Sequence, residues 1–426
     1  MRHPGWKGLL LGLVLALAAA VPAGAYEMGE AGEPCRLSAG LSHCAYVDEE
    51  GVLWTWGSGL AGQLGVPLEE KGLDLQGELV PLSEEPQKVM EGVASVSTGG
   101  SFTLALKTDG TLWAWGANEA GQLGTGDRTA RLMPVQVLDN VAAISAGDRH
   151  SAALRIDGTL WTWGDNLYGQ LGDGTLTGRA QPAQVLTGVT AVSAGAGSTG
   201  AVREDGTLWT WGENLFGQLG DGAVQNRSLP AQVLEGVTAV ALGGYHTAAL
   251  DTAGRLWMWG SNIDGQLGGG TADDLETLPV PVDLPAAVRT VSAGTGHTAA
   301  LLADGTLWTW GRNDRQQLGL DRQETTVPQP AQVATGDKVR SVSAGTYQTV
   351  CLLADGTLQT WGSQFIALPG EGEAQEALAP VQVVPEGDGG PVWVPWVILG
   401  SSAVLLAAAG CRGRKERVGG LRTLYF

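Results

Sequence analysis

The chain has 426 residues and a formal net charge of −19. This acidity excludes the proteins that wrap nucleic acid, because those proteins place Lys and Arg against phosphates. Apolar residues make up 43% of the chain, which excludes general disorder, and 4 cysteines are too few for a dense disulfide framework. The 66 glycines, and 16 tryptophans against only 4 phenylalanines, indicate one short pattern copied many times.

The N-terminus predicts a secretory signal peptide over residues 1–25. Arg2 and Lys7 precede the apolar run Leu9–Ala20, which is too short to span a bilayer comfortably. Ala23 and Ala25 then supply the small residues of a cleavage site. An uncleaved membrane anchor is the alternative interpretation of this segment.

Between residues 34 and 385 the motif W-x-W-G recurs at intervals of 48 to 59 residues, and its last copy is degenerate. The copies are Trp54–Gly57, Trp113–Gly116, Trp161–Gly164, Trp209–Gly212, Trp257–Gly260, Trp308–Gly311 and Gln359–Gly362. Self-similarity at this period indicates an array of supersecondary units.

The fourth unit shows what each copy contains. Short β runs are expected at Val189–Val192, Thr199–Arg203, Thr207–Trp211 and Pro230–Leu234. Asp205-Gly206 is a strong hairpin signal between the second and third runs. Four antiparallel strands in about 50 residues are typical of one propeller blade, so the sequence predicts an all-β, seven-bladed β-propeller of four-stranded blades.

The two ends of the array predict how the ring closes. The first unit begins at its inner strand near Pro34, and the last unit ends in an extra run, Pro380–Val384. We expect this last run to pair into the blade that the N-terminus begins, which would lock the ring. A linear solenoid is the alternative, but it would require polar capping repeats.

The repeat consensus resembles a known family. A-G-x-x-H-[TS]-x-A-L, D-G-x-L-W-x-W-G, N-x-x-G-Q-L-G and P-x-x-V follow one another in each unit. This order is similar to the regulator of chromosome condensation repeat, over about four-fifths of the chain. The resemblance implies a seven-bladed propeller. It does not imply one function, because propellers of this family do several unrelated jobs.

Four histidines share one repeat position, His43, His150, His246 and His297. Equivalent positions converge around the axis of a ring, so a transition-metal site is one hypothesis. The other is one structural hydrogen bond per blade. We favour the second and expect no metal, because Phe102, Ser198 and Gln348 interrupt the series.

The tryptophans of the motif are also interpreted as structural. These positions are Trp113, Trp161, Trp209, Trp257 and Trp308. A chromophore cluster is the alternative, by resemblance to the plant ultraviolet-B photoreceptor. The G-W-R-H-T motif of that receptor is absent, and the corresponding stretch here is G-D-R-H-S, so we expect the tryptophans to pack between blades. No cofactor is expected.

Two further features of the exported part carry predictions. Cys35 and Cys44 lie on consecutive strands of the first unit, and a hairpin pivot at Ala39-Gly40 would place them opposite each other as a candidate disulfide. The segments Val66–Pro86 and Gln364–Ala379 are long, acidic and the most variable between units. Variable loops on a rigid scaffold are where recognition usually occurs.

The C-terminus predicts a membrane span. A linker over 386–391 precedes an uncharged apolar segment over 392–410, which is long enough to cross the hydrocarbon. The tail over 411–426 begins with a basic cluster, and such clusters stay in the cytoplasm. We therefore expect a single-pass plasma-membrane protein with its propeller outside the cell.

These features favour a non-enzymatic binding module that engages a protein partner through its loop faces, with no nucleic acid. Family members that are secreted inhibitors of beta-lactamases are a precedent for a protein partner. Two alternatives remain. One is nucleotide exchange on a GTPase, as in the family's nuclear founder, which the export signal disfavours. The other is an enzyme with an unrecognised site, although no acid–base pair stands out.

Overall fold

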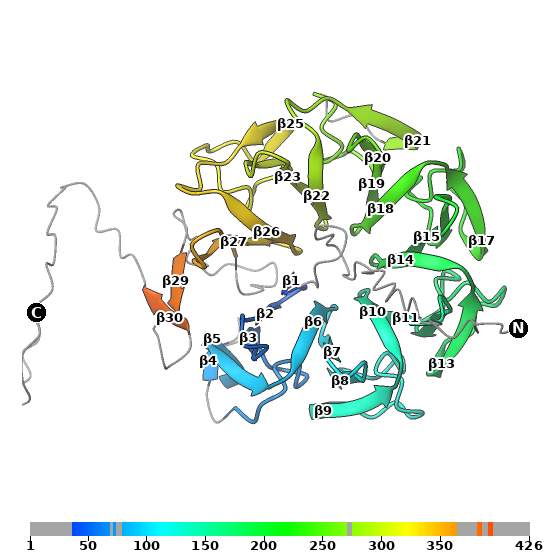
Figure 1. Ribbon diagram of the computed structural model, residues 1–426, viewed down its shortest axis with the longest axis vertical. Helices are drawn as coiled ribbons and strands as arrows, with labels where there is room; N and C mark the ends of the chain where they lie inside the picture. Colours follow the sequence, from blue (N-terminus) through cyan, green and yellow to red (C-terminus); the bar gives the residue numbers. More distant parts are fainter. Residues whose placement is uncertain are drawn as a thin grey trace, which may run out of the picture. The chain divides into compact units, whose positions relative to one another are not determined.

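Seven antiparallel β-sheets form the computed structural model and are arranged as blades around one axis (Figure 1). The structure describes residues 36–68, 71–73, 79–270, 275–363, 381–385 and 391–394. Contacts divide the chain into one compact unit, Met1–Val394, and a second, Pro395–Phe426, and all described residues belong to the first. The predicted all-β, seven-bladed propeller is confirmed.

Each blade uses consecutive strands, numbered here from the axis outward. The first strands are β1 (Leu37–Ala39), β6 (Val93–Thr98), β10 (Val141–Ala146), β14 (Val189–Ala194), β18 (Val237–Leu242), β22 (Val288–Ala293) and β26 (Val339–Ala344). The second strands are β2 (His43–Val47), β7 (Phe102–Lys107), β11 (His150–Arg155), β15 (Ser198–Arg203), β19 (His246–Asp251), β23 (His297–Leu302) and β27 (Gln348–Leu353).

The third strands are β3 (Leu53–Ser58), β8 (Leu112–Gly116), β12 (Leu160–Gly164), β16 (Leu208–Gly212), β20 (Leu256–Ser261), β24 (Leu307–Arg312) and β28 (Leu358–Gly362). The fourth strands are β5 (Leu79–Met90), β9 (Arg131–Leu138), β13 (Arg179–Leu186), β17 (Arg227–Leu234), β21 (Leu275–Val282), β25 (Thr326–Gln332) and β29 (Val381–Pro385). Blades one and seven carry a fifth strand, β4 (Lys71–Leu73) and β30 (Pro391–Val394).

The Asp–Gly hairpins are built by local hydrogen bonds. In blade four the Asp205 carboxylate accepts from the Thr207 hydroxyl at 2.6 Å and from its backbone N–H at 3.0 Å. Gly206 adopts φ +77°, which a side chain would oppose. The Thr207 hydroxyl and backbone bonds also lower the pKa of Asp205. The four β runs expected for this blade are therefore confirmed, although the first strand continues through Ala194 and the fourth begins at Arg227.

The core lies between neighbouring blades. The second tryptophan of each W-x-W-G motif is buried there. In blades two to six its indole N–H reaches back to the preceding blade. Trp211, for example, clusters with Leu154 of blade three and Val192 of its own blade. Its Nε1 donates to the Gln170 carbonyl at 2.9 Å. In these blades the tryptophan therefore joins two blades by both apolar contact and a directed bond.

A ring of glycines closes around the axis. The seven members follow each first strand and are Gly40, Gly99, Gly147, Gly195, Gly243, Gly294 and Gly345. The position that a Cβ would occupy on each one lies against the carbonyl oxygen of the next member, including the step from Gly345 to Gly40 at 2.7 Å. No other residue would allow this approach, so these glycines are required for close contact between blades.

The ring closes by packing and not by strand exchange. The expected pairing of Pro380–Val384 with the N-terminal blade is wrong, because β29 pairs with β28 inside blade seven. β1 lies beside β26 and β27 (Figure 1). The Ala39 N–H donates to the Ser343 hydroxyl at 2.8 Å, and Leu37 packs against Val350. The Ala194 N–H donates to the Ser145 hydroxyl of its preceding blade in the same way, so the seam uses a contact that recurs elsewhere in the ring.

The register of β1 corrects the expected hairpin pivot. Ala39 pairs with Cys44, and the turn runs through residues 40–42, so a pivot at Ala39-Gly40 is wrong. Cys44 is buried in β2, and Cys35 lies outside the described residues. The candidate disulfide therefore stays a prediction.

Little of the predicted terminal segments is described. Pro391–Val394 forms β30 and pairs with β29, with Trp393 opposite Val383. The first residues of the expected span are thus in a strand and not a helix, as their β-branched and aromatic composition favours. The predicted segments 1–25, 395–410 and 411–426 lie outside the described residues. Within the described parts of the chain, no helix has the length and apolarity to cross a membrane.

Candidate functional site

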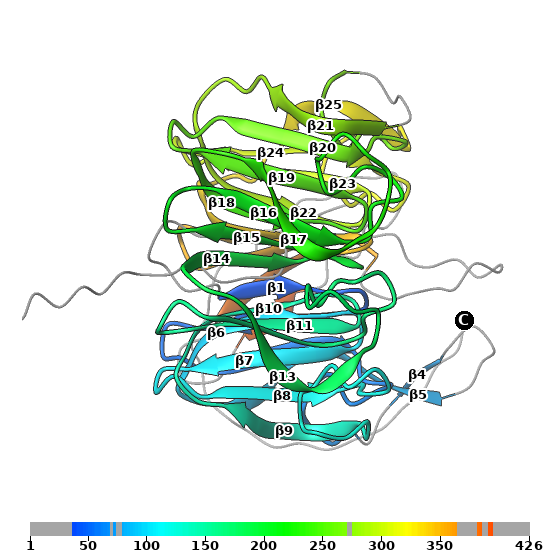
Figure 2. The same ribbon diagram turned by 90° about the vertical axis from the view of Figure 1, so that its right-hand side faces the viewer.

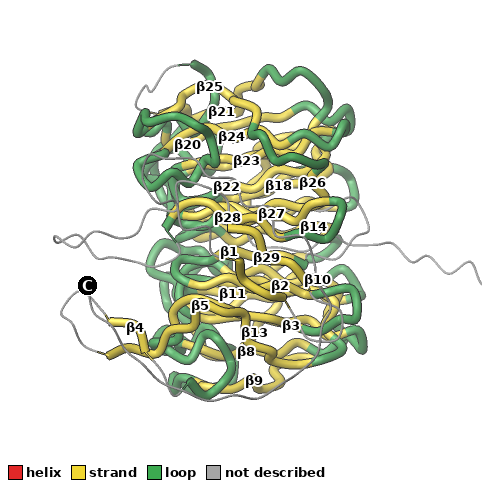
Figure 3. Tube along the Cα trace, turned by 90° about the vertical axis from the view of Figure 1, so that its left-hand side faces the viewer, coloured by secondary structure: helices red, strands yellow, loops and turns green. Residues whose placement is uncertain are grey.

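One face of the ring carries two sets of connections. Because the strands alternate in direction, the turn between strands one and two and the loop after strand three emerge at the same end of each blade. We call this end the loop face; in blade four it comprises Gly195–Gly197 and residues 213–222. The Asp–Gly hairpins lie at the other end. Edge-on views show strands running between two faces that carry the loops and turns (Figures 2 and 3).

The loop motif N-x-x-G-Q-L-G is a rigid scaffold for its two variable positions. In blade three the Asn166 side-chain carbonyl accepts from the Leu171 N–H at 2.9 Å. The Gln170 side chain accepts from the Tyr168 N–H at 3.0 Å. Both amides are buried, while Leu167 is 69% exposed and Tyr168 is 37% exposed. The loop therefore fixes its backbone inside the protein and presents the variable residues to solvent.

Exposed apolar side chains recur at the first variable position. Leu60, Leu167, Leu215 and Ile263 are all more than half exposed there. Glu119 and Asp314 replace them in blades two and six. A single exposed leucine is common on protein surfaces and needs no explanation. Exposed aliphatic residues at the same position of several blades are a recurring feature, and we call them the apolar rim of the loop face.

A hollow of about 560 Å³ adjoins this rim at Leu167 and is lined by residues of blades two to five. Its walls include Tyr168, Glu213 and Tyr245, with Asp148 toward the axis. The Tyr245 ring is held by Phe216, with ring centroids 5.0 Å apart. This volume is in the range of ligand pockets, about 300–1,000 Å³.

The hollow is electrostatically unusual because a carboxylate is nearly buried in it. Glu213 is 7% exposed. Burial raises the pKa of Glu213, and the charge of Asp148 raises it further. Burial, followed by the charges of Glu213 and Asp148, also raises the pKa of Tyr245. The three groups share one negative environment.

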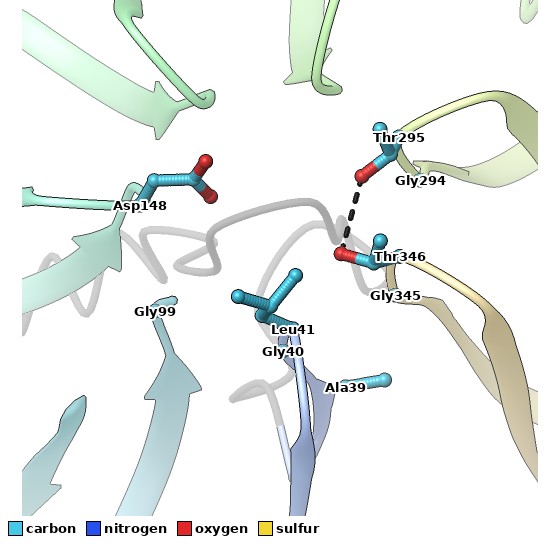
Figure 4. A pocket seen from close by; sticks show the side chains of 9 residues that line it. All are labelled: Ala39, Gly40, Leu41, Gly99, Asp148, Gly294, Thr295, Gly345 and Thr346. Carbon is cyan, nitrogen blue, oxygen red and sulfur yellow. Dashed lines mark hydrogen bonds between the residues drawn. The ribbon is translucent and has the colours of Figure 1, made fainter. Parts of the chain in front are cut away.

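The axis itself offers little room. Figure 4 shows the Asp148 side chain directed toward the axis, across from Thr295 and Thr346, whose hydroxyls are 3.2 Å apart. The cavity here is about 10 Å³, the size of a single water site. The hollow between the blades is therefore the better candidate for a ligand.

The four histidines lie elsewhere, inside the interfaces between blades. His150 Nε2 is 2.9 Å from Thr199 Oγ1, and that hydroxyl donates to the Gln170 carbonyl, so the histidine nitrogen is the donor. His43, His246 and His297 bond the next blade's threonine in the same way. Within the described ranges no three His, Cys, Asp or Glu side chains are grouped to hold a metal ion.

Burial keeps these histidines neutral. It lowers the pKa of His43 and His246 to about 3 and that of His150 and His297 to about 4. The interruption at Ser198 comes with a local change of packing. The Leu242 Cβ of the neighbouring blade lies against Gly195, and its end methyls lie against Gly200. Leu242 therefore fills space beside Gly200, where blades three and five have Ala152 and Ala248.

The first tryptophans of the motif are half-buried beside the Asp–Gly hairpins. Their indole N–H groups donate to a nearby threonine hydroxyl or aspartate, and most carry a basic side chain over the ring. These residues are Trp113, Trp161, Trp209, Trp257 and Trp308. The structure does not bring these predicted positions, or the histidines, into the hollow.

Sequence reasoning missed the residues that form the hollow. Tyr168 lies in the N-x-x-G-Q-L-G loop of blade three, and Glu213 directly precedes the same loop in blade four. The repeat pattern alone assigns no binding role to this loop. One signal in the sequence could have pointed to this face. A leucine or isoleucine follows the asparagine of the N-x-x-G-Q-L-G loop in several units, although a residue in a Gly-rich loop is expected to be exposed. Of the predicted recognition segments, Val66–Pro86 contributes β4, which extends blade one by pairing with β5. Gln364–Ala379 lies outside the described residues.

Comparison with known proteins agrees with this architecture. Human WBSCR16 superposes with a TM-score of 0.68 at 22% identity, covering 80% of this chain and 95% of that structure. Yeast RCC1 (Prp20), solved with Kap60, gives a TM-score of 0.66 at 22% identity, covering 72% and 77%.

Sequence comparison identifies the family. The ultraviolet-B receptor UVR8 of Arabidopsis thaliana is 33% identical over 101 residues, which are 24% of this chain and 23% of that protein. The match thus spans less than a quarter of that relative's length. A family model, RCC1-like domain, matches residues 11–334. The chain belongs to the RCC1-like domain family.

Proposed function

We propose that this chain is a non-enzymatic binding propeller that holds a protein partner on its loop face. The observation that carries the proposal is the apolar rim, in which Leu167, Leu215 and Ile263 are exposed on three consecutive blades. Contiguous exposed apolar side chains mark interaction surfaces on soluble domains. Aromatic residues inside the rim are the type that dominates binding energy in protein interfaces.

The loop face is also preorganised. Buried asparagine and glutamine side chains fix the loop backbones, so little conformational entropy is lost when a partner binds. Yeast RCC1 was solved in complex with Kap60, which is a precedent for a protein partner in this family. For the present chain, the chemistry of the partner is inferred from the rim and the hollow alone.

We further propose that the propeller is displayed outside the cell. The signal at residues 1–25 would start export, and the apolar segment over 392–410 would stop it before the basic tail. Protease added to intact cells (spheroplasts, if an outer wall intervenes) should digest the propeller and spare a tag placed after Phe426. The reverse pattern would refute the topology and favour an intracellular role, including regulation of a GTPase.

A loop-face variant tests the binding proposal. Leu167→Asp combined with Leu215→Asp places two charges on the rim without changing the core. Ile156→Asp is the matched control, because Ile156 is 71% exposed in the same blade as Leu167 but lies beside the hairpin of the other face. We expect proximity labelling on living cells to mark specific proteins with wild type and with the control, and to lose them with the loop-face variant. Equal labelling by all three would contradict the proposal.

A further inference from the structure

We propose that the hollow lined by blades two to five is a socket for a single lysine or arginine side chain of the protein partner. This inference rests on the proposed function, since it names the chemistry by which the loop face would recognise that partner. Four observations carry it: a largely buried carboxylate, a second carboxylate that lines the same hollow, two aromatic side chains in its wall and an apolar rim beside it.

The buried carboxylate is Glu213. Its side chain lies over Gly197, where a Cβ would come within 2.6 Å of Glu213 Oε2 and 2.9 Å of the Tyr168 ring. Because Gly197 has no side chain, the Glu213 side chain can occupy this position in the wall of the hollow. Among the described residues, none donates a hydrogen bond to this carboxylate or forms an ion pair with it. The Glu213 side chain is largely withdrawn from water, although its carboxylate oxygens are not among the fully buried unpartnered atoms of the described residues. An incoming cation would offset the cost of this withdrawal.

Among the residues that the structure describes, the basic groups that line the hollow do not supply that cation. Asp148 adds a second negative charge on the axial side of the hollow. Arg149 is exposed, and its Nε lies 3.9 Å from Asp165. Arg128 donates to the Glu119 carbonyl at 3.3 Å. Both basic groups line the hollow, but neither approaches Glu213 within ion-pair distance.

The walls suit the other parts of a long basic side chain. Tyr168 and Tyr245 line the same hollow as the carboxylate, and a cation beside an aromatic ring is attracted by its quadrupole. The methylene stem of lysine or arginine would lie on the apolar rim while its charged end reaches Glu213. A free amine or guanidine would leave this rim uncovered, so the geometry favours a side chain carried by a protein.

Peptide selection on the purified full-length chain tests the chemistry directly. Random phage-displayed peptides are selected against wild type, Glu213→Gln, and the control Glu204→Gln. Glu204 is exposed in the same blade, beside the hairpin of the other face. We expect selected peptides to be enriched in Lys or Arg flanked by apolar residues for wild type and the control. This enrichment should be lost with Glu213→Gln.

The best arginine peptide is then compared with the same peptide carrying citrulline, an uncharged isostere. We expect binding to wild type to weaken about tenfold or more with citrulline, because a charge-assisted bond is lost. Glu213→Gln should bind the two peptides about equally. Its melting temperature should be no lower than that of wild type, since the substitution removes an unpaired buried charge.

The socket would be overturned if peptides selected on wild type showed no enrichment of basic residues, or if wild type bound the arginine and citrulline peptides equally well. It would also be overturned if free arginine bound wild type as tightly as the peptide does. A Glu213→Gln variant that lost peptide binding and also melted at a lower temperature would contradict it too, because the loss would then reflect damage to the fold. If Leu167→Asp with Leu215→Asp abolishes partner labelling while Glu213→Gln leaves it intact, the proposed function stands and the socket fails. If neither change affects labelling, both fail.

Discussion

Four buried histidines should make the propeller sensitive to mild acid. In the folded chain their pKa values are lowered to about 3 or 4 from an ordinary value of 6.5. The unfolded chain therefore takes up protons first as the pH falls. Stability from these groups is fully present above pH 6.5 and is lost progressively as the pH falls from there toward 3–4.

The size of the loss follows from the shift. At pH 5.5, one unit below the ordinary pKa, each histidine costs about 1.4 kcal/mol of stability, and the four together about 6 kcal/mol. A typical domain has about 5–15 kcal/mol in total, so the loss is large. Ordinary Asp and Glu titrate mostly below this window. Glu213 acts in the opposite sense, because its raised pKa relieves a cost on acidification.

The matched variant is His246→Gln, because Gln348 occupies the same position in blade seven. Urea unfolding followed by tryptophan fluorescence at pH 7.5 and 5.5 gives the loss for each protein. We expect the variant to lose about 1.4 kcal/mol less than wild type between the two pH values, whatever its stability at pH 7.5. Equal losses, or a wild-type loss below about 1 kcal/mol, would show that the buried histidines do not govern acid stability.

Two further substitutions probe the contacts between blades. Gly294→Ala should lower stability by about 1–3 kcal/mol, because its Cβ would meet the Gly345 carbonyl oxygen. Gly269→Ala, which has open space around it, is the control, and equal melting temperatures would contradict the role of the glycine ring. Trp211→Phe should cost about 2 kcal/mol, since it removes the bond to the Gln170 carbonyl and leaves a small void. A calorimetric melt unchanged by this substitution would show that the indole bond is dispensable.

Much of the fold could be predicted from local signals. Asp205-Gly206 fixes a hairpin through bonds made by its immediate neighbours, and the alternation around Trp209 and Trp211 sets which indole is buried. Because these signals recur seven times, strand positions and blade number follow from one well-interpreted unit. The contact between the first and last blades could not be predicted in this way. The local pattern of β29 is equally compatible with pairing to β28 in blade seven and with pairing to a strand of blade one.

The candidate site depended on tertiary structure almost entirely. Tyr168, Glu213 and Tyr245 come from three blades and are unremarkable in their own units. They form a hollow only because the ring places neighbouring loops side by side.

The axial glycines show the same division. Local signals along the chain predict that Gly294 follows a strand and precedes a histidine. That Gly345 of the next blade occupies the space a side chain would need is visible only in the assembled ring. Local hydrogen bonds and side-chain alternation are encoded within a few residues, so they can be interpreted along the chain. Close approach, burial and the field around a carboxylate depend on atoms about 50 residues away, so they exist only once the ring has closed.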